Sequence, residues 1–459
     1  MTTDPRLERL HQYLRARGGG LYIGSGPGGL AFAAPQQAAL VLGPPRSGKT
    51  STLVIPNVLA APGAVVATST KPDVLLATLR RRASVGRCWL LDPTGTVRVP
   101  EGVTPIRWSP VQACRQWDEA LVSVRAMVGA GGGPRLRNGD ATHWTERAEA
   151  MLAPLLHAAA ITGGDMERVV RWVLRQDLET PCAELSARGA TLASDVLAGL
   201  AATDSRELSG IWSTAAGVLA AYRSEAALVA ARAPNFDPRT LPATSDTVYV
   251  CAPARHQALA APIVVAFLEQ LRAGAFTLVG EGQAMPPVVL ALDELANIAP
   301  IPDLPSLVSE GGGQGLLTLG CLQDLSQARQ RWGPAAEGFL SLFGTKVVLG
   351  GIADVATLEL VSRLGGDVDL PVRSVSRAPW WAPGRGAPTT TWSTRRQRRI
   401  PVDAVSQQPA GTGLVLVGNR PPTRVGLRPW WEVEPFATPT VTPRPFAHPR
   451  ATLQVAREL

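Results

Sequence analysis

An eight-residue segment, Gly43-Pro-Pro-Arg-Ser-Gly48-Lys49-Thr50, constrains the fold of this chain more than any other feature of its sequence. It matches the pattern G-x-x-x-x-G-K-[ST] at every defined position, between an apolar strand-like run and a helix-forming run. In such a loop the backbone N–H groups and the helix start surround an anion. The lysine reaches the outer phosphates of a nucleotide, and the hydroxyl binds Mg²⁺. The segment predicts a site for ATP and Mg²⁺ made by Gly43, Pro44, Pro45, Arg46, Ser47, Gly48, Lys49, Thr50 and Ser51.

A second apolar run, residues 288–292, ends in two carboxylates, Asp293 and Glu294. We expect Asp293 to bind Mg²⁺ and Glu294 to act as the base that polarises the attacking water, with Lys49 as the catalytic cation. The alternative is a pair of solvated acids at a strand end. Adjacent acids here favour a hydrolysing motor over a kinase, which needs no carboxylate to activate water. Gln323 follows the next strand, where it is expected to sense the γ-phosphate unless it only caps that strand.

The order of apolar runs predicts the fold class. Short buried runs separated by helical patterns indicate an α/β fold with a mostly parallel, doubly wound sheet. The expected strands are 38–42, 64–68, 88–91, 247–251, 288–292, 316–320, 347–349 and 414–417. The expected division is a first part of the nucleotide-binding domain at 1–115, an inserted all-α domain at 116–235, a second motor part at 236–435 and an irregular tail at 436–459. Residues 129–140 and 380–399 are both expected to be loops, the former carrying Arg135 and Arg137.

Composition indicates which ligands and which cellular compartment to expect. Net charge is +8, which favours a polyanion or an anionic membrane face, although many basic proteins bind neither. The 45 basic residues include only three lysines, Lys49, Lys71 and Lys346. The five cysteines form no C-x-x-C pair and the five histidines are scattered, so reduced thiols in a cytoplasmic protein are expected, without disulfide or zinc. No uninterrupted apolar run reaches about 18 residues, so no membrane span is predicted.

Several further motifs follow one another in the order typical of a known family. They are Ser69-Thr-Lys71-Pro-Asp73, Gly86, Leu91-Asp92-Pro93, Asp293-Glu294-Leu-Ala-Asn, Gln323-Asp-Leu-Ser-Gln, Trp332-Gly333, Phe343-Gly-Thr-Lys346, Gly350, Asp354 and Leu364-Gly365. On these residues the chain resembles the TraG/TraD/VirD family of type IV coupling proteins, from about residue 22 to residue 431.

The resemblance implies a RecA-like motor with an all-α cap that hydrolyses ATP. It implies a homo-hexameric ring with sites between subunits and a central channel for DNA, expected to be single-stranded. The implied partners are a relaxase and the components of a type IV secretion channel at the inner face of the cell membrane. Lys346 falls where relatives carry a lysine close to the nucleotide, the alternative being an ordinary strand-end charge.

Two departures from the family pattern stand out. Relatives usually begin with transmembrane helices and none is predicted here, so the expectation is either a separate membrane subunit as partner or a soluble variant of the family. Relatives also carry a basic residue, a candidate arginine finger, in the loop that here reads Glu310-Gly-Gly-Gly-Gln314. The remaining candidates for that role are Arg329, Arg331 and Arg363, together with Arg46, which lies inside the phosphate loop and would act in cis.

Two alternatives to a conjugative motor stay open at this point. One is a DNA pump of the FtsK/HerA kind, against which the helical insertion argues. The other is a nucleotide-gated adaptor that recruits a relaxase without hydrolysis. The segment with Arg395, Arg396, Arg398 and Arg399 near Trp392 either contacts phosphates and bases or is a solvated loop.

Overall fold

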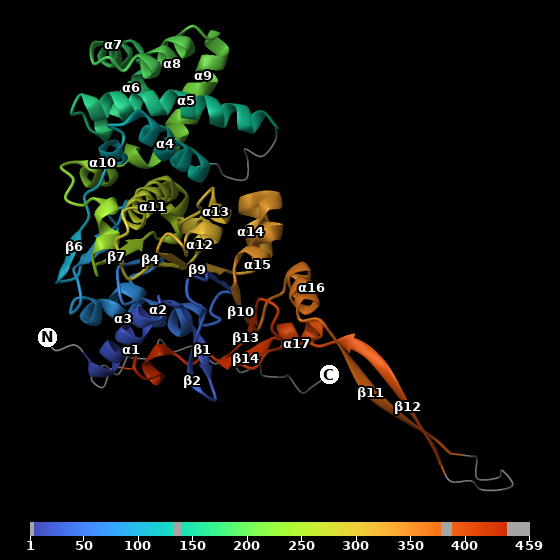
Figure 1. Ribbon diagram of the computed structural model, residues 1–459. Helices are drawn as coiled ribbons and strands as arrows, with labels where there is room; N and C mark the ends of the chain where they lie inside the picture. The colour runs from blue at the N-terminus through green and yellow to red at the C-terminus, as the bar shows by residue number, and fades with distance from the viewer. Residues whose placement is uncertain (1–3, 132–138, 378–387, 438–459) are drawn as a thin grey trace, which may run out of the picture.

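The computed structural model describes residues 4–131, 139–377 and 388–437 of the 459-residue chain. In that part of the chain, a twelve-stranded sheet has the order β2-β1-β14-β13-β10-β3-β9-β8-β4-β7-β5-β6 (Figure 1). Its strands are β1 (Tyr22–Gly26), β2 (Gly29–Phe32), β3 (Ala39–Leu42), β4 (Val65–Ser69), β5 (Cys88–Leu91), β6 (Val103–Pro105), β7 (Thr247–Cys251), β8 (Val288–Leu292), β9 (Leu316–Leu322), β10 (Thr345–Leu349), β13 (Thr412–Val417) and β14 (Thr423–Gly426).

The sheet is parallel from β10 across to β6, and the strands from β13 to β2 extend it with antiparallel pairs. The prediction of a mostly parallel α/β sheet is therefore confirmed. The central strands read as continuous apolar runs because both faces of the sheet are covered. Sequence reasoning missed β1, β2, β6 and β14, which are short or lie towards the edges.

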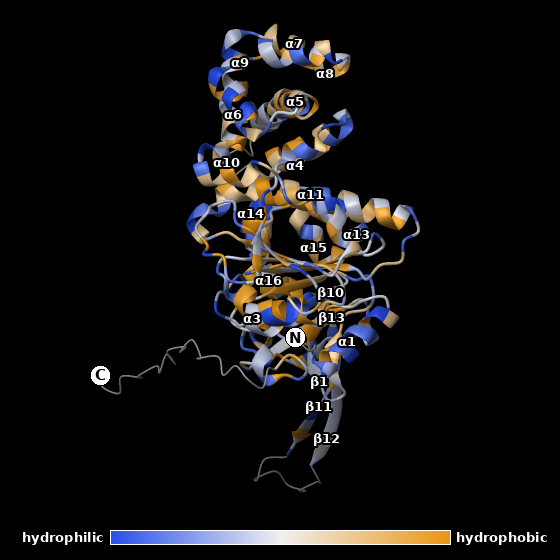
Figure 2. Ribbon diagram, turned by 90° about the vertical axis from the view of Figure 1, so that its left-hand side faces the viewer, coloured by the Kyte–Doolittle hydropathy of each residue, from blue (hydrophilic) through white to orange (hydrophobic). Residues whose placement is uncertain are grey.

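Helices cover both faces of the sheet (Figure 1). On one face lie α1 (Pro5–Ala16), α2 (Ile55–Ala60), which continues the π-helical turn η1 (Thr50–Val54), and α3 (Asp73–Arg82). On the other lie α11 (Gln257–Gly280), α12 (Leu295–Ile298), α13 (Leu304–Glu310), α14 (Leu325–Trp332), α15 (Phe339–Leu342), α16 (Val355–Leu364) and α17 (Val402–Ser406). Figure 2 shows apolar residues concentrated in these layers around the sheet.

A run of helices separates β6 from β7 in the sequence and lies beyond α11 in Figure 1. It consists of α4 (Trp117–Gly131), α5 (Gly139–Ile161), α6 (Met166–Arg175), α7 (Glu179–Ala187), α8 (Thr191–Ala201), α9 (Ser205–Val218) and α10 (Glu225–Ala231). Helix α11 joins it to the motor by packing against α4. The expected domain limits themselves remain a prediction.

Two expected loops need correction. Residues 129–131 belong to α4 and residue 139 opens α5, because alanine and apolar residues carry the helix further than the glycines suggest; Arg135 and Arg137 lie outside the described residues. The segment expected to be a loop at 380–399 contains strand β12 (Thr389–Arg398), which pairs with the unpredicted β11 (Asp367–Ser376). Threonine, valine and tryptophan have high strand propensity, which outweighed the prolines and glycines between the two strands. Of the expected irregular tail, residues 438–459 lie outside the described part.

Within the described residues, one helical stretch is long and apolar enough to cross a membrane by length and composition. This is Ala254–Gly280, and 56% of its apolar window is buried within the protein. Its buried side chains belong to the main apolar core, and it contacts α4 and α12.

Candidate functional site

The carboxyl ends of three neighbouring parallel strands bring the predicted site residues together. Asp293 and Glu294 follow β8 and Gln323 follows β9, while the phosphate loop follows β3. The ends of β3 and β9 are level, because Leu42 pairs with Leu322 and the N–H of Gly43 donates to the carbonyl of Leu322 at 3.2 Å. Strand β8 ends two residues earlier, opposite residue 320, so the two carboxylates that follow it come level with the end of β9. Side chains that are far apart in sequence thus face one edge of the sheet, which is the usual ligand site of such folds.

The phosphate loop owes its shape to particular backbone positions. Gly48 has φ +94°, which glycine adopts without steric cost, and Arg46 has φ +64°, which is unusual for a side chain of its size. A Cβ on Gly43 would approach the Ser47 hydroxyl to 2.8 Å and Leu349 Cβ to 3.0 Å. Replacement of that glycine would therefore move the loop against β10.

Lys49 lies across this loop. Its side chain is buried, and its ammonium donates to the carbonyls of Gly43 and, at 3.0 Å, Pro44. The Ser47 hydroxyl is buried in the same loop and has no hydrogen-bond partner among the described residues. An ammonium and an unpartnered hydroxyl in one loop at the start of a helix are suited to bind phosphate oxygens.

Asp293 and Thr50 form the part of the site suited to a cation. The Thr50 hydroxyl donates to Asp293 Oδ2 at 2.6 Å, and the Thr68 hydroxyl holds the backbone carbonyl of Asp293 at 2.7 Å. Burial raises the pKa of Asp293 to about 6, against the smaller effect of the Thr50 hydrogen bond. Hard oxygen donors of this type fit Mg²⁺, whose charge would offset the cost of burying the carboxylate.

Glu294 occupies a strained backbone position. It has φ +55° and ψ +46°, a left-handed conformation that costs a side-chain-bearing residue roughly 1–2 kcal/mol. Its carboxylate is half-buried and accepts from Asn297 Nδ2 at 3.1 Å. Strain of this kind is retained where the surrounding structure fixes the chain, and it turns the backbone sharply between β8 and α12. No pattern in the sequence pointed to this conformation.

Gln323 stands at the start of a helix tied to distant parts of the molecule. Its N–H donates to the Gln327 side chain at 3.0 Å, and Asp324 caps α14. On α14, Arg329 forms an ion pair with Asp354 at 2.8 Å. Arg331 donates to the α4 carbonyls at residues 129 and 130, at 3.0 and 2.7 Å. Sequence reasoning missed this connection between the sensor segment and the helical region, because it depends on tertiary packing.

Lys346 is not part of the loop edge. It lies inside β10 opposite Leu40, two residues before the carboxyl end of β3, and only 8% of its surface is exposed. Burial lowers its pKa. Its position next to a nucleotide therefore remains a prediction from resemblance.

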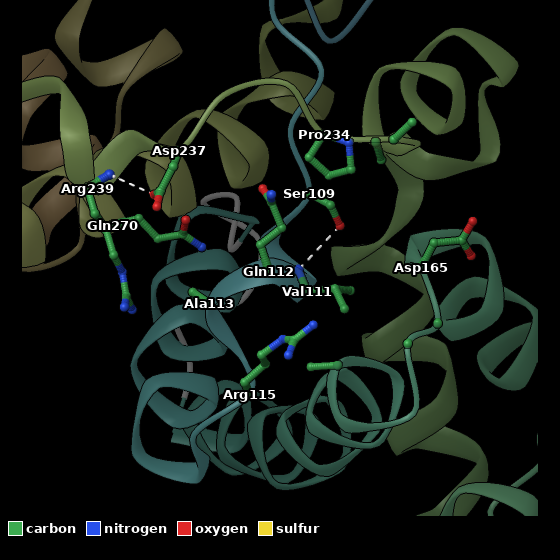
Figure 3. A pocket seen from close by; sticks show the side chains of 15 residues that line it. Ser109, Val111, Gln112, Ala113, Arg115, Asp165, Pro234, Asp237, Arg239 and Gln270 are labelled. Atoms are coloured by element: carbon green, nitrogen blue, oxygen red, sulfur yellow. Dashed lines mark hydrogen bonds between the residues drawn. The ribbon is translucent and has the colours of Figure 1, made fainter.

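A separate cavity of about 430 Å³ lies where the helical region joins the motor (Figure 3). Figure 3 shows Gln112, Arg115 and Gln270 among the side chains that line it. Its lining includes no residue of the phosphate loop and neither of the β8 carboxylates. The predicted nucleotide site and this cavity are therefore different places.

A phosphate loop after β3, paired carboxylates after β8 and a largely parallel sheet define a P-loop nucleotide-binding protein of the RecA-like class. The profile of the family "Type IV secretory system Conjugative DNA transfer" matches residues 8–452. The chain belongs to this family of conjugative coupling proteins, as its motifs indicated.

Solved structures agree on the fold. The unbound bacterial conjugative coupling protein TrwB has a TM-score of 0.69 at 18% sequence identity, covering 92% of this chain and 91% of that one. TrwB with the GTP analogue GDPNP scores 0.67 at 18% identity, and TrwB with ADP and Mg²⁺ scores 0.66 at 18%. Each of these two covers 91% of this chain and 92% of TrwB. At this identity the likeness establishes the fold. No curated protein matches the sequence significantly.

Proposed function

We propose that this coupling protein hydrolyses ATP and uses the energy to move DNA, or DNA joined to a relaxase, towards a type IV secretion channel. The observation that carries the proposal is the convergence of Lys49, Thr50, Asp293 and Glu294 at one edge of the sheet. Membership of the family supports DNA as the cargo. The nucleotide complexes of TrwB support ATP with Mg²⁺ as ligands.

The roles of the loop residues follow from their geometry. Lys49 would exchange the carbonyls of Gly43 and Pro44 for phosphate oxygens, which compensate its buried charge better than neutral carbonyls do. Thr50 and Asp293 would hold Mg²⁺, which when bound neutralises charge on the phosphates. The backbone N–H groups of the loop orient the phosphates.

Glu294 would take the proton of the attacking water. Its carboxylate is less buried than that of Asp293, and the hydrogen bond that it accepts from Asn297 is exposed. The two neighbouring acids therefore differ in environment, one suited to a cation and the other to proton transfer. Gln323 would report the state of the γ-phosphate to α14, and Arg331 would carry the movement of α14 to α4.

We expect the arginine finger, which stabilises charge on the γ-phosphate, to be either Arg46 or Arg363. Arg329 and Arg331 are engaged with Asp354 and with α4 inside the subunit, which disfavours them as groups supplied to a neighbour. Arg46 is exposed in the loop itself, and Arg363 is exposed with a long ion pair to Glu359 at 3.6 Å. A finger raises turnover by roughly 10³ to 10⁵, so without DNA or neighbours the protein should be a slow ATPase.

The assembly and location follow from the same proposal. A homo-hexamer with sites between subunits would place single-stranded DNA in a central channel at the inner face of the membrane. A relaxase, channel components and a separate membrane subunit are the proposed partners. Mass measurement with ATP and DNA present tests the ring, and a monomer under all conditions would contradict it.

Steady-state ATP turnover, measured with and without single-stranded DNA over a range of protein concentrations, tests the motor. Turnover should rise with DNA and with concentration, and Arg46→Ala or Arg363→Ala should remove the rise while ATP binding persists. If wild-type turnover never exceeds background in the presence of DNA, the nucleotide-gated adaptor replaces the motor as the proposed function.

A further inference from the structure

The β11–β12 ribbon is exposed on both faces. Along β11 only Val368 is partly covered, and the side chains of residues 390–398 on β12 are exposed. Figures 1 and 2 show the ribbon extending away from the body of the molecule. An isolated two-stranded ribbon is at best marginally stable in water, and exposed strand edges tend to associate with other molecules. Such a structure is suited to bind a partner.

The side chains of β12 show the chemistry of that partner. Every residue from 390 to 399 has a side-chain hydrogen-bond donor and none is acidic: Thr390, Thr391, Trp392, Ser393, Thr394, Arg395, Arg396, Gln397, Arg398 and Arg399. Hydroxyl, amide and guanidinium donors are the groups that contact phosphate oxygens, and an exposed aromatic ring stacks on bases. A polyanion with stacking surfaces fits this strand.

The ribbon's own acids neutralise only part of its charge. Both lie at the start of β11, where Asp367 contacts Arg396 at 3.5 Å and Arg398 at 3.0 Å. Arg395 is opposite Leu370 on the other face. Further out, Arg373 is directly opposite Trp392, whose ring is 66% exposed. Cationic groups therefore lie on both faces, one of them beside a free aromatic ring.

The apolar residues of the ribbon argue against a lipid surface as the partner. Among the described residues of the ribbon, Val368, Leu370 and Val372 lie on one face, while Val375 and Trp392 lie on the other. A membrane-surface element collects its apolar side chains on one face, which this ribbon does not do. Nucleic acid needs no such face, and a two-stranded ribbon fits the major groove or tracks a single strand.

We propose that the β11–β12 ribbon is a DNA-binding arm, outside the nucleotide site, whose donors on β12 contact phosphates and whose Trp392 stacks on a base. The inference rests on the proposed function, in which DNA is the cargo. The proposal adds to that function a surface that binds the DNA and lies away from the site of ATP hydrolysis.

The arm can be removed with little disturbance to the body. The N–H of Arg399 donates to the carbonyl of Gly366 at 2.8 Å, so the two ends of the ribbon are adjacent. A variant in which Asn-Gly replaces residues 367–398 should fold and should bind ATP as the wild type does. A finer variant, R373Q/R395Q, removes one arginine from each face. Its matched control, R87Q/R98Q, removes two exposed arginines near β5 and β6, at the opposite edge of the sheet.

Anisotropy of a labelled DNA of about 30 nucleotides, single-stranded or duplex, measures binding at several salt concentrations. We expect arm removal to weaken binding about tenfold or more at 0.1 M salt. R373Q/R395Q should lower the slope of log affinity against log salt by about 1.4 for the single strand, with the control unchanged. Trp392→Ala should weaken single-strand binding several-fold, and Trp392→Phe should restore it.

Three outcomes would overturn the inference. If the arm-deleted protein binds DNA with wild-type affinity and salt slope, the arm is not the contact surface although DNA remains the cargo. Equal losses in R373Q/R395Q and its control would show a general effect of charge. Arm-dependent binding to anionic vesicles without any arm-dependent DNA binding would make the partner a membrane. A wild type that binds no DNA at any salt would instead contradict the proposed function itself.

Discussion

The carboxyl edge of the sheet and the β11–β12 ribbon use arginine, lysine and acidic residues in opposite ways. At the edge, Lys49 and Asp293 are buried and held in one position by Thr50, Thr68 and loop carbonyls. On the ribbon, Arg396 pairs with Asp367 while three quarters of its side chain remains exposed. The edge is preorganised for one small ligand, whereas the ribbon offers solvated donors to a long one.

The largest expected effect distinguishes the role of Lys49 from that of Glu294 at the edge of the sheet. Lys49→Ala should abolish ATP binding, because the phosphates lose the buried ammonium of the loop. Glu294→Gln should keep ATP binding and lose turnover, since an amide cannot accept the proton. Binding of a fluorescent ATP analogue, with turnover measured separately, gives the comparison. If both variants lose binding equally, the assigned roles are wrong.

The next prediction compares how much a buried arginine and an exposed arginine contribute to the free energy of unfolding. Arg82 is fully buried and donates to Thr247 Oγ1, to the carbonyls of Ala61 and Ser245, and to that of residue 63, at 2.7–2.9 Å. Arg82→Met should lower the free energy of unfolding by about 3–5 kcal/mol, because these acceptors lose their donors. Arg398→Gln on the ribbon should change it by less than about 1 kcal/mol. Chemical denaturation of both variants measures the difference; similar losses would remove the contrast between the two regions.

A smaller effect is the pH dependence of stability caused by His11, a buried histidine of α1. Burial lowers the pKa of His11 to about 4, and its ring donates to the carbonyl of Leu59 at 2.8 Å. In the unfolded chain this group titrates near its ordinary value of 6.5, so the unfolded state binds more protons between the two values. The contribution of His11 to the free energy of unfolding should therefore fall by about 2 kcal/mol from pH 7 to pH 5. Asp293, whose pKa is raised to about 6, acts in the opposite direction over this range, so the His11 contribution is measured as the wild-type value minus that of a variant without the histidine.

The control for this prediction is His11→Gln, which can still donate to Leu59 but does not titrate. The difference in stability between wild type and variant should shrink towards low pH. The arm-deleted protein should show the wild-type pH dependence. A wild-type profile parallel to that of the variant would show that His11 titrates normally.

The sequence predicted the edge better than the ribbon for physical reasons. Lys49 and Thr50 belong to a local motif whose spacing is set by the phosphate it surrounds, and Asp293 follows a strand that is apolar because both its faces are covered. The left-handed backbone of Glu294 was not predictable, because glutamate has no preference for it. The bonds from Arg331 to α4 join segments some 200 positions apart and have no local signal.

The ribbon was missed because it lacks the pattern by which strands are recognised. A strand that covers a core alternates apolar and polar residues, and β12 has donors on both of its faces. Its pairing with β11 is set by strand propensity and register alone. The basic residues were found, but their arrangement on two faces of a ribbon required the structure.

Displacement of streptavidin from the end of a biotinylated single strand tests most directly whether this protein is a motor. We expect the wild type to displace streptavidin with ATP and Mg²⁺, and not with a non-hydrolysable analogue. Glu294→Gln should bind the same DNA and displace none. Equal displacement with ATP and with the analogue, or none by a wild type that hydrolyses ATP on DNA, would contradict the account.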